Sequence, residues 1–210
     1  MQNPDALING FKRFQRRYYK QDNSLYAQLR EAQRPKVLVI GCSDSRVDPA
    51  ILTDCQPGDL FVVRDVANLV PPYEKNAPDN GVSSAVEYAV RHLNVEHIVV
   101  LGHSHCGGID ALMHCDSDHP SGEFIDQWVM TARSARQKVE QEMSDKDEDQ
   151  KVCACEQASI LVSLENLMTF PWVAGAVHAG RLTLHGWYFD LDTGSLLAWN
   201  ADTTAFEKLA

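Results

Sequence analysis

The chain has 210 residues, of which 44% are hydrophobic and 23% charged, and its formal net charge is −10 at pH 7. These values are typical of a globular protein with one core, and the acidic balance excludes a nucleic-acid partner because no basic stripe is present to neutralise phosphates. The sequence has no apolar stretch near the roughly 20 residues of a membrane-spanning helix and no secretion signal at its start, so we expect a cytoplasmic protein without a membrane partner.

Two helices are predicted in residues 4–34, where apolar side chains recur at intervals of three, four and seven. Asn23 and Ser24 interrupt this pattern and indicate the break between the helices. The first helix carries an aromatic stripe that requires a partner surface, either on the same chain or on a second subunit. We therefore divide the chain into an N-terminal helical arm, residues 1–34, and one α/β domain, residues 35–210.

Strands alternate with helices in the first half of this domain. Apolar runs rich in β-branched residues predict strands at 37–41, 60–64 and 97–101, and helical patterns lie around 49–53 and at 83–93. This order of strand, helix and strand implies a right-handed parallel crossover.

The second half of the domain is predicted to be mainly helical before it returns to strands. A helix begins at Ile109, a long helix follows at 123–143, a polar linker at 144–149, and a further helix at 153–169 that Pro171 ends. Strands at 182–189 and 196–199, joined by a tight turn at 192–194, predict an antiparallel hairpin at the sheet edge. The predicted fold class is thus α/β, with a central, mostly parallel sheet, that edge hairpin, flanking helices and the N-terminal arm.

Three soft metal ligands follow two of the predicted strands. Cys42 comes directly after the first strand, and His103 with Cys106 follows the third. Two thiolates and one imidazole suit Zn²⁺, and the carboxyl ends of parallel strands are where α/β proteins bind ligands. A structural zinc site would show a fourth Cys or His at short spacing, and none is obvious. Three ligands with an open fourth position are typical of a catalytic zinc, one per chain.

Asp44 and Arg46 lie two and four residues after Cys42. Asp44 could occupy the fourth position on the metal or accept a hydrogen bond from the water bound there. Arg46 could pair with Asp44 through two hydrogen bonds and fix its orientation.

The other candidate ligands have weaker patterns. His105 is an alternative ligand to His103, but its spacing to Cys106 is too short for both to point at one metal. Cys153 and Cys155 lie in a predicted helix, where side chains two residues apart point in different directions, so we interpret both as structural. Cys55 and Cys115 are interpreted as structural as well.

The two motifs Cys42-Ser43-Asp44-Ser45-Arg46 and His103-x-x-Cys106-Gly107-Gly108 together resemble the β-class carbonic anhydrases. The blocks at 61–73 and 84–89 also resemble this family, and more closely its plant-type branch than its enterobacterial branch. The similarity extends from about Gln33 through Phe189.

The resemblance implies reversible hydration of carbon dioxide to bicarbonate and a proton. Cys42, His103 and Cys106 match the zinc ligands of the family, and Asp44 with Arg46 matches the dyad that orients zinc-bound hydroxide. Five further residues match the substrate pocket. The amide of Gln33 and the backbone N–H of Gly107 match the groups that bind substrate oxygen. The apolar wall of the pocket is matched by Phe61, Val66 and Tyr88.

The resemblance also implies a homo-oligomer. The family builds this pocket across a dimer interface, so we expect a homodimer or a dimer of dimers, a homotetramer, with the N-terminal arm wrapping the second subunit. A subset of the family has a bicarbonate regulatory site whose Trp, Arg and Tyr align with Val39, Arg64 and Phe189. Only the arginine is present, so we expect no such regulation and interpret Arg64 as a structural ion-pair partner.

Two questions stay open at this level. We predict that Asp44 is held away from the metal near neutral pH, which leaves an open active site. Two other functions are compatible with the same residues: hydrolysis of a linear relative of carbon dioxide, such as carbon disulfide or carbonyl sulfide, and a zinc-binding or bicarbonate-sensing module without catalysis.

Overall fold

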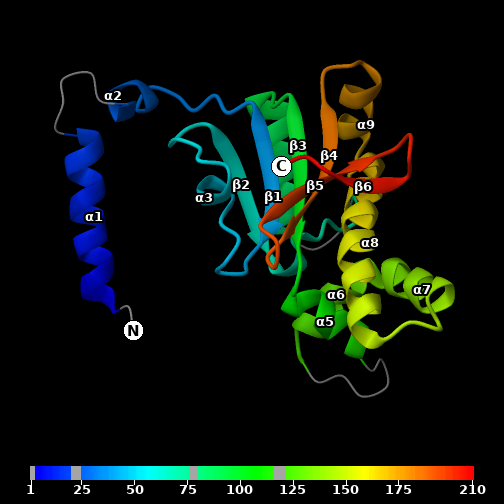
Figure 1. Cartoon of the computed structure of the whole chain (residues 1–210). Helices are drawn as coiled ribbons and strands as arrows, with labels where there is room; N and C mark the ends of the chain where they lie inside the picture. Colours follow the sequence, from blue (N-terminus) through cyan, green and yellow to red (C-terminus); the bar gives the residue numbers. More distant parts are fainter. Residues whose placement is uncertain (1–2, 20–24, 76–79, 116–121) are drawn as a thin grey trace.

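A six-stranded mixed sheet forms the centre of the molecule (Figure 1). The computed structural model of the chain describes residues 3–19, 25–75, 80–115 and 122–210. The spatial order of the strands is β2-β1-β3-β4-β5-β6, with the first four parallel and the last two antiparallel. Their bounds are β1 Val37–Cys42, β2 Leu60–Asp65, β3 His97–His103, β4 Thr183–Asp190, β5 Ser195–Asn200 and β6 Ala205–Lys208.

The five predicted strands are confirmed, including the hairpin of β4 and β5. The hairpin is not at the edge of the sheet, however, because β6 pairs with β5 on the outside. This strand has four residues and mostly exposed side chains, so no apolar pattern indicates it in the sequence.

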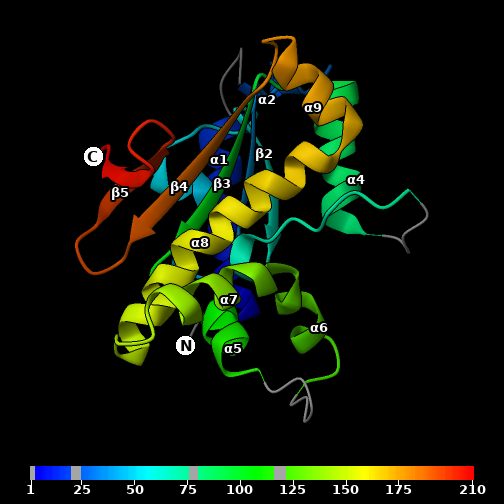
Figure 2. The same ribbon diagram turned by 90° about the vertical axis from the view of Figure 1, so that its right-hand side faces the viewer.

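Helices pack on one face of the parallel strands (Figure 2). They are α4 Gly81–Tyr88, continued by the π-helical turn η2 Ala89–Leu93, with α8 Glu148–Thr169 and α9 Pro171–His178. Gly102 of β3 and Gly186 of β4 allow α8 to approach, because a Cβ atom at either position would meet Ile160 at 2.7 or 2.9 Å. The main core lies here and consists of strand residues such as Leu38, Ile98 and Val100 against the helices.

The region between β3 and α8 differs from its prediction. The predicted helix at 123–143 is divided into α6 Ile125–Val129, η3 Met130–Ala132 and α7 Arg133–Glu142. The break lies between two tertiary anchors: Trp128 Nε1 donates to the Val66 carbonyl, and Arg136 donates to carbonyls at the end of α5 Gly107–His114. Helical periodicity cannot indicate such anchors.

α8 begins inside the predicted polar linker, because the carboxylate of Asp147 caps it by accepting from the Gln150 N–H at 2.8 Å. Pro171 does end α8, but it also begins α9, as proline is favoured in the first turn of a helix. No single helix of the described ranges is long and apolar enough to cross a membrane, and α8 and α9 reach the required length and composition only as a pair bent by 93°.

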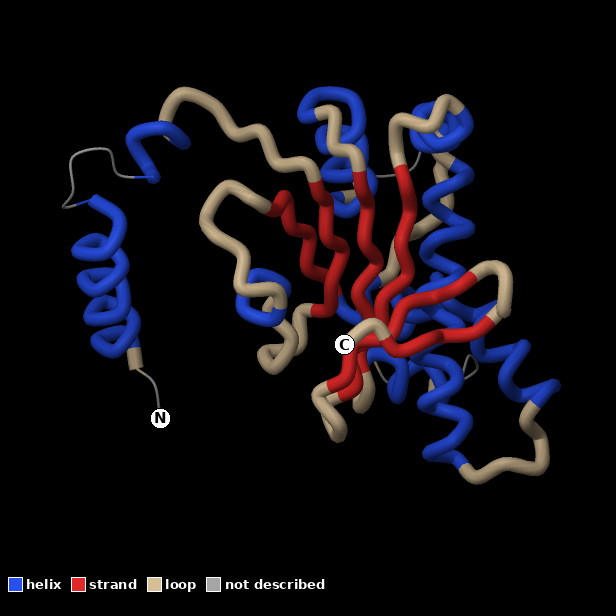
Figure 3. The backbone as a smooth tube through the Cα atoms, turned by 45° about the horizontal axis from the view of Figure 1, so that its top comes forward, coloured by secondary structure: helices blue, strands red, loops and turns tan. Residues whose placement is uncertain are grey.

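The N-terminal arm extends away from the sheet (Figures 1 and 3). It contains α1 Pro4–Tyr19 and α2 Leu25–Leu29, and the predicted break at Asn23 and Ser24 lies outside the described residues. α1 has no buried residue, and its apolar stripe is open to solvent, with Leu7 65% and Phe11 60% exposed. The short helix α3 Pro49–Leu52 lies beside β2 (Figure 1).

Candidate metal centre

Cys42, His103 and Cys106 come together at the carboxyl end of the parallel strands. Cys42 ends β1, His103 ends the neighbouring strand β3, and Cys106 is the N-cap residue of α5. All three are buried, their ligand atoms lie within 4.8 Å of one another, and the two Sγ atoms are 3.9 Å apart. The structure therefore gathers the predicted ligands into one group that could hold a metal.

The hydrogen bonding of the two ring nitrogens of His103 suits a metal ligand. Its Nδ1 lies 2.8 Å from the Ser104 carbonyl oxygen. Because a carbonyl only accepts, Nδ1 carries the hydrogen and Nε2 presents its lone pair. Nε2 is buried and has no hydrogen-bond partner among the described residues. A buried acceptor without a partner is costly, so this atom fits a metal ligand.

The Cys42 sulfur receives two backbone hydrogen bonds, from Asp44 N–H at 3.4 Å and Ala67 N–H at 3.3 Å. The contact with Cys106, followed by the nearby His103 and these two backbone donors, lowers the pKa of Cys42 well below its usual range. The same contact with Cys42, together with burial, raises the pKa of Cys106. A soft divalent cation bound by both sulfurs would favour the thiolate form of each.

Asp44 is held by Arg46 rather than by the three ligands. Arg46 Nε donates to Oδ1 at 3.0 Å, Nη2 donates to Oδ2 at 2.7 Å, and the Arg46 backbone N–H donates to Oδ1 at 2.9 Å. These hydrogen bonds lower the pKa of Asp44 well below its ordinary value. The guanidinium also donates to the His105 carbonyl at 3.0 Å, which connects the loops that follow β1 and β3.

Arg64 braces the loop that carries Asp44. Its guanidinium donates to the carbonyl of Cys42 at 3.0 Å, to the carbonyl of Asp44 at 2.6 Å and to the carboxylate of Asp48 at 3.0 Å. Arg64 is therefore an ion-pair partner, as the sequence suggested. The two positions that align with the rest of the regulatory site, Val39 and Phe189, belong to an apolar cluster on the same face of the sheet.

The first turn of α5 forms one wall of the metal group. A Cβ atom at Gly107 would meet nothing within 4 Å, so space is open beside its backbone. A Cβ atom at Gly108 would meet Val66 Cγ1 at 2.6 Å, so Val66 packs directly against this turn. Gly107 and Val66, two of the predicted pocket residues, thus lie beside the metal group.

The other three predicted pocket residues lie toward the opposite end of the sheet. Gln33 precedes β1, and Phe61 of β2 pairs with Leu38 near the start of β1. Cys42, in contrast, is the last residue of β1. Six strand residues span about 17 Å, which no glutamine side chain crosses. Tyr88 stacks near Phe61 with ring centroids 5.9 Å apart and is 45% exposed. Within one chain, Phe61 and Tyr88 thus form a ring pair away from the metal group, and Gln33 is an exposed residue before β1.

The alternative ligand His105 points elsewhere. Its backbone is left-handed, with φ 56°, and its Nε2 lies 2.7 Å from Asp192 Oδ2 in the β4–β5 turn. The remaining cysteines are free thiols outside the metal group, namely Cys55, Cys115, Cys153 and Cys155.

Sequence reasoning missed Glu156, a buried acid behind the metal group. It is 3% exposed, its Oε1 accepts from the Cys106 N–H at 2.9 Å, and its Oε2 accepts from the Tyr188 hydroxyl at 2.7 Å. Burial raises the pKa of Glu156. The sequence could have indicated this residue, because Glu156 places a charge on the buried face of the predicted helix. That face is formed by residues 156, 159, 160, 163 and 167.

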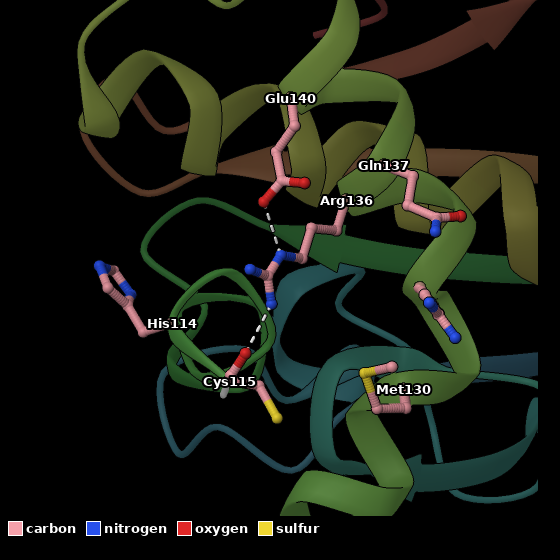
Figure 4. A pocket seen from close by; sticks show the side chains of 7 residues that line it. His114, Cys115, Met130, Arg136, Gln137 and Glu140 are labelled. Carbon is pink, nitrogen blue, oxygen red and sulfur yellow. Dashed lines mark hydrogen bonds and ion pairs between the residues drawn. The ribbon is translucent and has the colours of Figure 1, made fainter. Parts of the chain in front are cut away.

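Two hollows flank this region. One of about 690 Å³ lies beside Cys106, Glu156 and Tyr188. The other, of about 420 Å³, lies between the end of α5 and α7 (Figure 4). There Arg136 binds the carbonyls of Leu112 and Cys115 and the carboxylate of Glu140, so it closes the end of α5 rather than serving the metal group.

Comparisons with known proteins converge on one family. The family model described as carbonic anhydrase matches residues 37–196. The chain is 41% identical over 201 residues to the chloroplastic beta carbonic anhydrase 5 of Arabidopsis thaliana, and the match covers 96% of this chain and 66% of that protein.

Solved structures give the same result. The structure of the beta-carbonic anhydrase CcaA superposes with a TM-score of 0.91 at 34% identity, over 98% of this chain and 92% of that one. A tetrameric beta-carbonic anhydrase from Sordaria macrospora superposes with a TM-score of 0.74 at 31% identity, over 98% of this chain and 93% of that one.

Proposed function

Because this chain belongs to the β-class carbonic anhydrase family, we propose that it catalyses the reversible hydration of carbon dioxide to bicarbonate and a proton. Cys42, His103 and Cys106 would hold one zinc ion per chain. The observation that carries the proposal is their convergence within 4.8 Å, with a buried His103 Nε2 that has no described protein partner. Zinc in this group would supply Lewis-acid activation of water.

Asp44 is proposed to orient the attacking water. The pairing with Arg46 keeps its carboxylate ionised and outside the three-ligand group, which supports an open site. A carboxylate in this state can only accept hydrogen bonds, so it fixes the direction of a water proton and leaves the oxygen lone pair free to attack.

The first turn of α5 is proposed to bind substrate oxygen. Helix N-terminal N–H groups favour negative charge, and charge develops on an oxygen of carbon dioxide as bicarbonate forms. The open space beside Gly107 supports close approach of substrate to this backbone, and Val66 contributes an apolar surface next to it.

A second subunit is proposed to complete the pocket. The distance that separates Gln33, Phe61 and Tyr88 from the metal group of their own chain supports a dimer in which each subunit contributes these residues to its partner. The exposed apolar stripe of α1 supports a wrapping arm, and a tetrameric relative supports assembly into a homo-oligomer.

Stopped-flow measurement of carbon dioxide hydration tests this function. We expect the zinc-loaded protein to accelerate hydration, chelation to remove the activity, and added zinc to restore it. The variant Cys42→Ser should lose zinc and activity, whereas Cys55→Ser, outside the metal group, should retain both. A zinc-loaded protein with no activity above buffer would refute the proposal.

A further inference from the structure

We propose that Glu156 is a positioning residue that fixes the Cys106 thiolate for zinc, with Tyr188 fixing Glu156 in turn. The inference rests on the proposed function in that it takes Cys106 as a zinc ligand. It concerns a carboxylate that the reaction chemistry does not otherwise use and that lies on α8, far in sequence from either metal-binding motif.

The contacts run through three separate elements. Glu156 of α8 accepts from the Cys106 N–H at 2.9 Å through one oxygen and from the Tyr188 hydroxyl of β4 at 2.7 Å through the other. Glu156 and Tyr188 are each 3% exposed and Cys106 is 1% exposed. The Tyr188 hydroxyl is also 3.6 Å from the thiol of Cys153, so the tyrosine is held on two sides. Both carboxylate oxygens of Glu156 are therefore engaged.

These contacts leave Cys106 little backbone freedom. Its N–H is bound by Glu156, and its carbonyl accepts from Ile109 N–H at 3.0 Å and Asp110 N–H at 2.9 Å as α5 begins. With both sides of the residue fixed, the direction of its Cα–Cβ bond is fixed as well. The position of Sγ, 3.9 Å from the sulfur of Cys42, then depends on a single rotamer.

The same helix also supports the other thiol. One face of α8 carries Ser163, whose hydroxyl donates to the Asn68 carbonyl and accepts from the Val70 N–H, both at 3.2 Å. These bonds hold the segment in which Ala67 N–H donates to Cys42 Sγ. α8 thus supports two ligands from different parts of the chain, Cys42 at the end of β1 and Cys106 at the start of α5.

Filling of space alone does not account for a carboxylate here. Burying an ionisable group is costly unless it is fully hydrogen-bonded, and an apolar side chain of similar volume would fill the same space at lower cost. What an apolar side chain cannot do is satisfy the Cys106 N–H. Residues that orient metal ligands in this way typically change metal affinity by about 10–100-fold when they are replaced.

The test measures metal binding rather than activity. Zinc dissociation constants are measured in the full chain by competition with a chromophoric chelator, and the visible spectrum of the cobalt(II) protein reports ligand geometry. Glu156→Leu should weaken zinc binding by about 10–100-fold and shift the cobalt bands. Glu156→Gln keeps an oxygen for the Cys106 N–H and should restore most of the affinity. Glu165→Leu, the same change at an exposed position of α8, should behave as wild type.

Tyr188→Phe provides a second, milder variant. It removes one hydroxyl, frees Glu156 Oε2, and should produce a smaller loss of zinc affinity with the cobalt bands shifted in the same direction. Should Glu156→Leu fail to fold, Tyr188→Phe decides the matter. Wild-type zinc affinity and an unchanged cobalt spectrum in whichever variant folds would overturn the inference. A wild-type protein that binds zinc but does not hydrate carbon dioxide would refute the proposed function and leave this test intact.

Discussion

Two arginines fix Asp44 from different directions. Arg46 binds its carboxylate, while Arg64 binds its backbone carbonyl and anchors the same loop to β2. Arg46 makes three hydrogen bonds to the carboxylate and Arg64 makes one to the backbone carbonyl, so the orientation of Asp44 is constrained at both its side chain and its main chain. The side chain that is proposed to direct the attacking water is therefore set before substrate arrives.

Asp44→Asn tests this residue. The variant keeps the shape of the side chain but removes its charge and places an N–H donor against the donors of Arg46, so the two-bond pairing with Arg46 is lost. Turnover of carbon dioxide should fall by about 10²-fold, the loss that misplacement of a reacting group can cause. Zinc content, measured by atomic absorption, should stay at one per chain because Cys42, His103 and Cys106 are unchanged. Unchanged turnover would remove Asp44 from the mechanism.

At the scale of elements, the segment η1 Val66–Asn68 joins the metal group to α5. Ala67 and Asn68 both adopt left-handed backbone conformations, with φ 68° and 50°, which are unfavourable for residues other than glycine. This conformation directs the Ala67 N–H at the Cys42 sulfur. Close packing of Gly108 against Val66 and Ala67 holds the segment in place.

Gly108→Ala should disturb this packing. Its Cβ atom would meet Val66 Cγ1 at 2.6 Å and Ala67 Cβ at 2.9 Å, and overpacking of this kind costs about 1–3 kcal/mol in the free energy of unfolding. Gly175→Ala is the matched control, because Gly175 lies inside α9 with no atom within 4 Å of a new Cβ. That control should gain about 0.5–1 kcal/mol from helix propensity. Urea unfolding measures both, and equal effects of the two changes would contradict this account.

Local patterns predicted most elements of the fold. The β-branched runs predicted the strands β1, β2 and β3. They also predicted that Cys42, His103 and Cys106 lie at or just after strand ends. They could not indicate the division of α6 from α7, because that break depends on contacts of Trp128 and Arg136 with distant segments.

The metal ligands were predictable for a related reason: each lies next to a strand end, and parallel strands bring their ends together. Glu156 was not, because its role depends on where α8 crosses β3 and β4. The distance of Phe61 from the metal ligands of its own chain agrees with the dimer-shared pocket that the family resemblance implies, although residue spacing alone could not indicate it.

At the scale of the whole molecule, the proposed dimer gives the arm a role in completing the pocket. Phe11→Lys places a charge in the exposed apolar stripe of α1, where it should leave the subunit fold intact but weaken the proposed dimer. Asn9→Lys adds the same charge on the opposite side of α1 and should leave assembly unchanged. Sedimentation velocity measures the dimer, and hydration activity should fall with it while zinc remains bound. A Phe11→Lys dimer as stable as wild type would exclude the arm from assembly.

The placement of the metal ligands on adjacent strands also has a kinetic consequence. Cys42 and His103 are separated by a segment of about 60 residues that contains β2, α4 and η2, so the ligands meet only after β1 and β3 have paired across that long loop. Zinc is therefore expected to bind a sheet that has already assembled. Once bound, it would link the ends of β1 and β3 to the first turn of α5, so its removal should lower the free energy of unfolding.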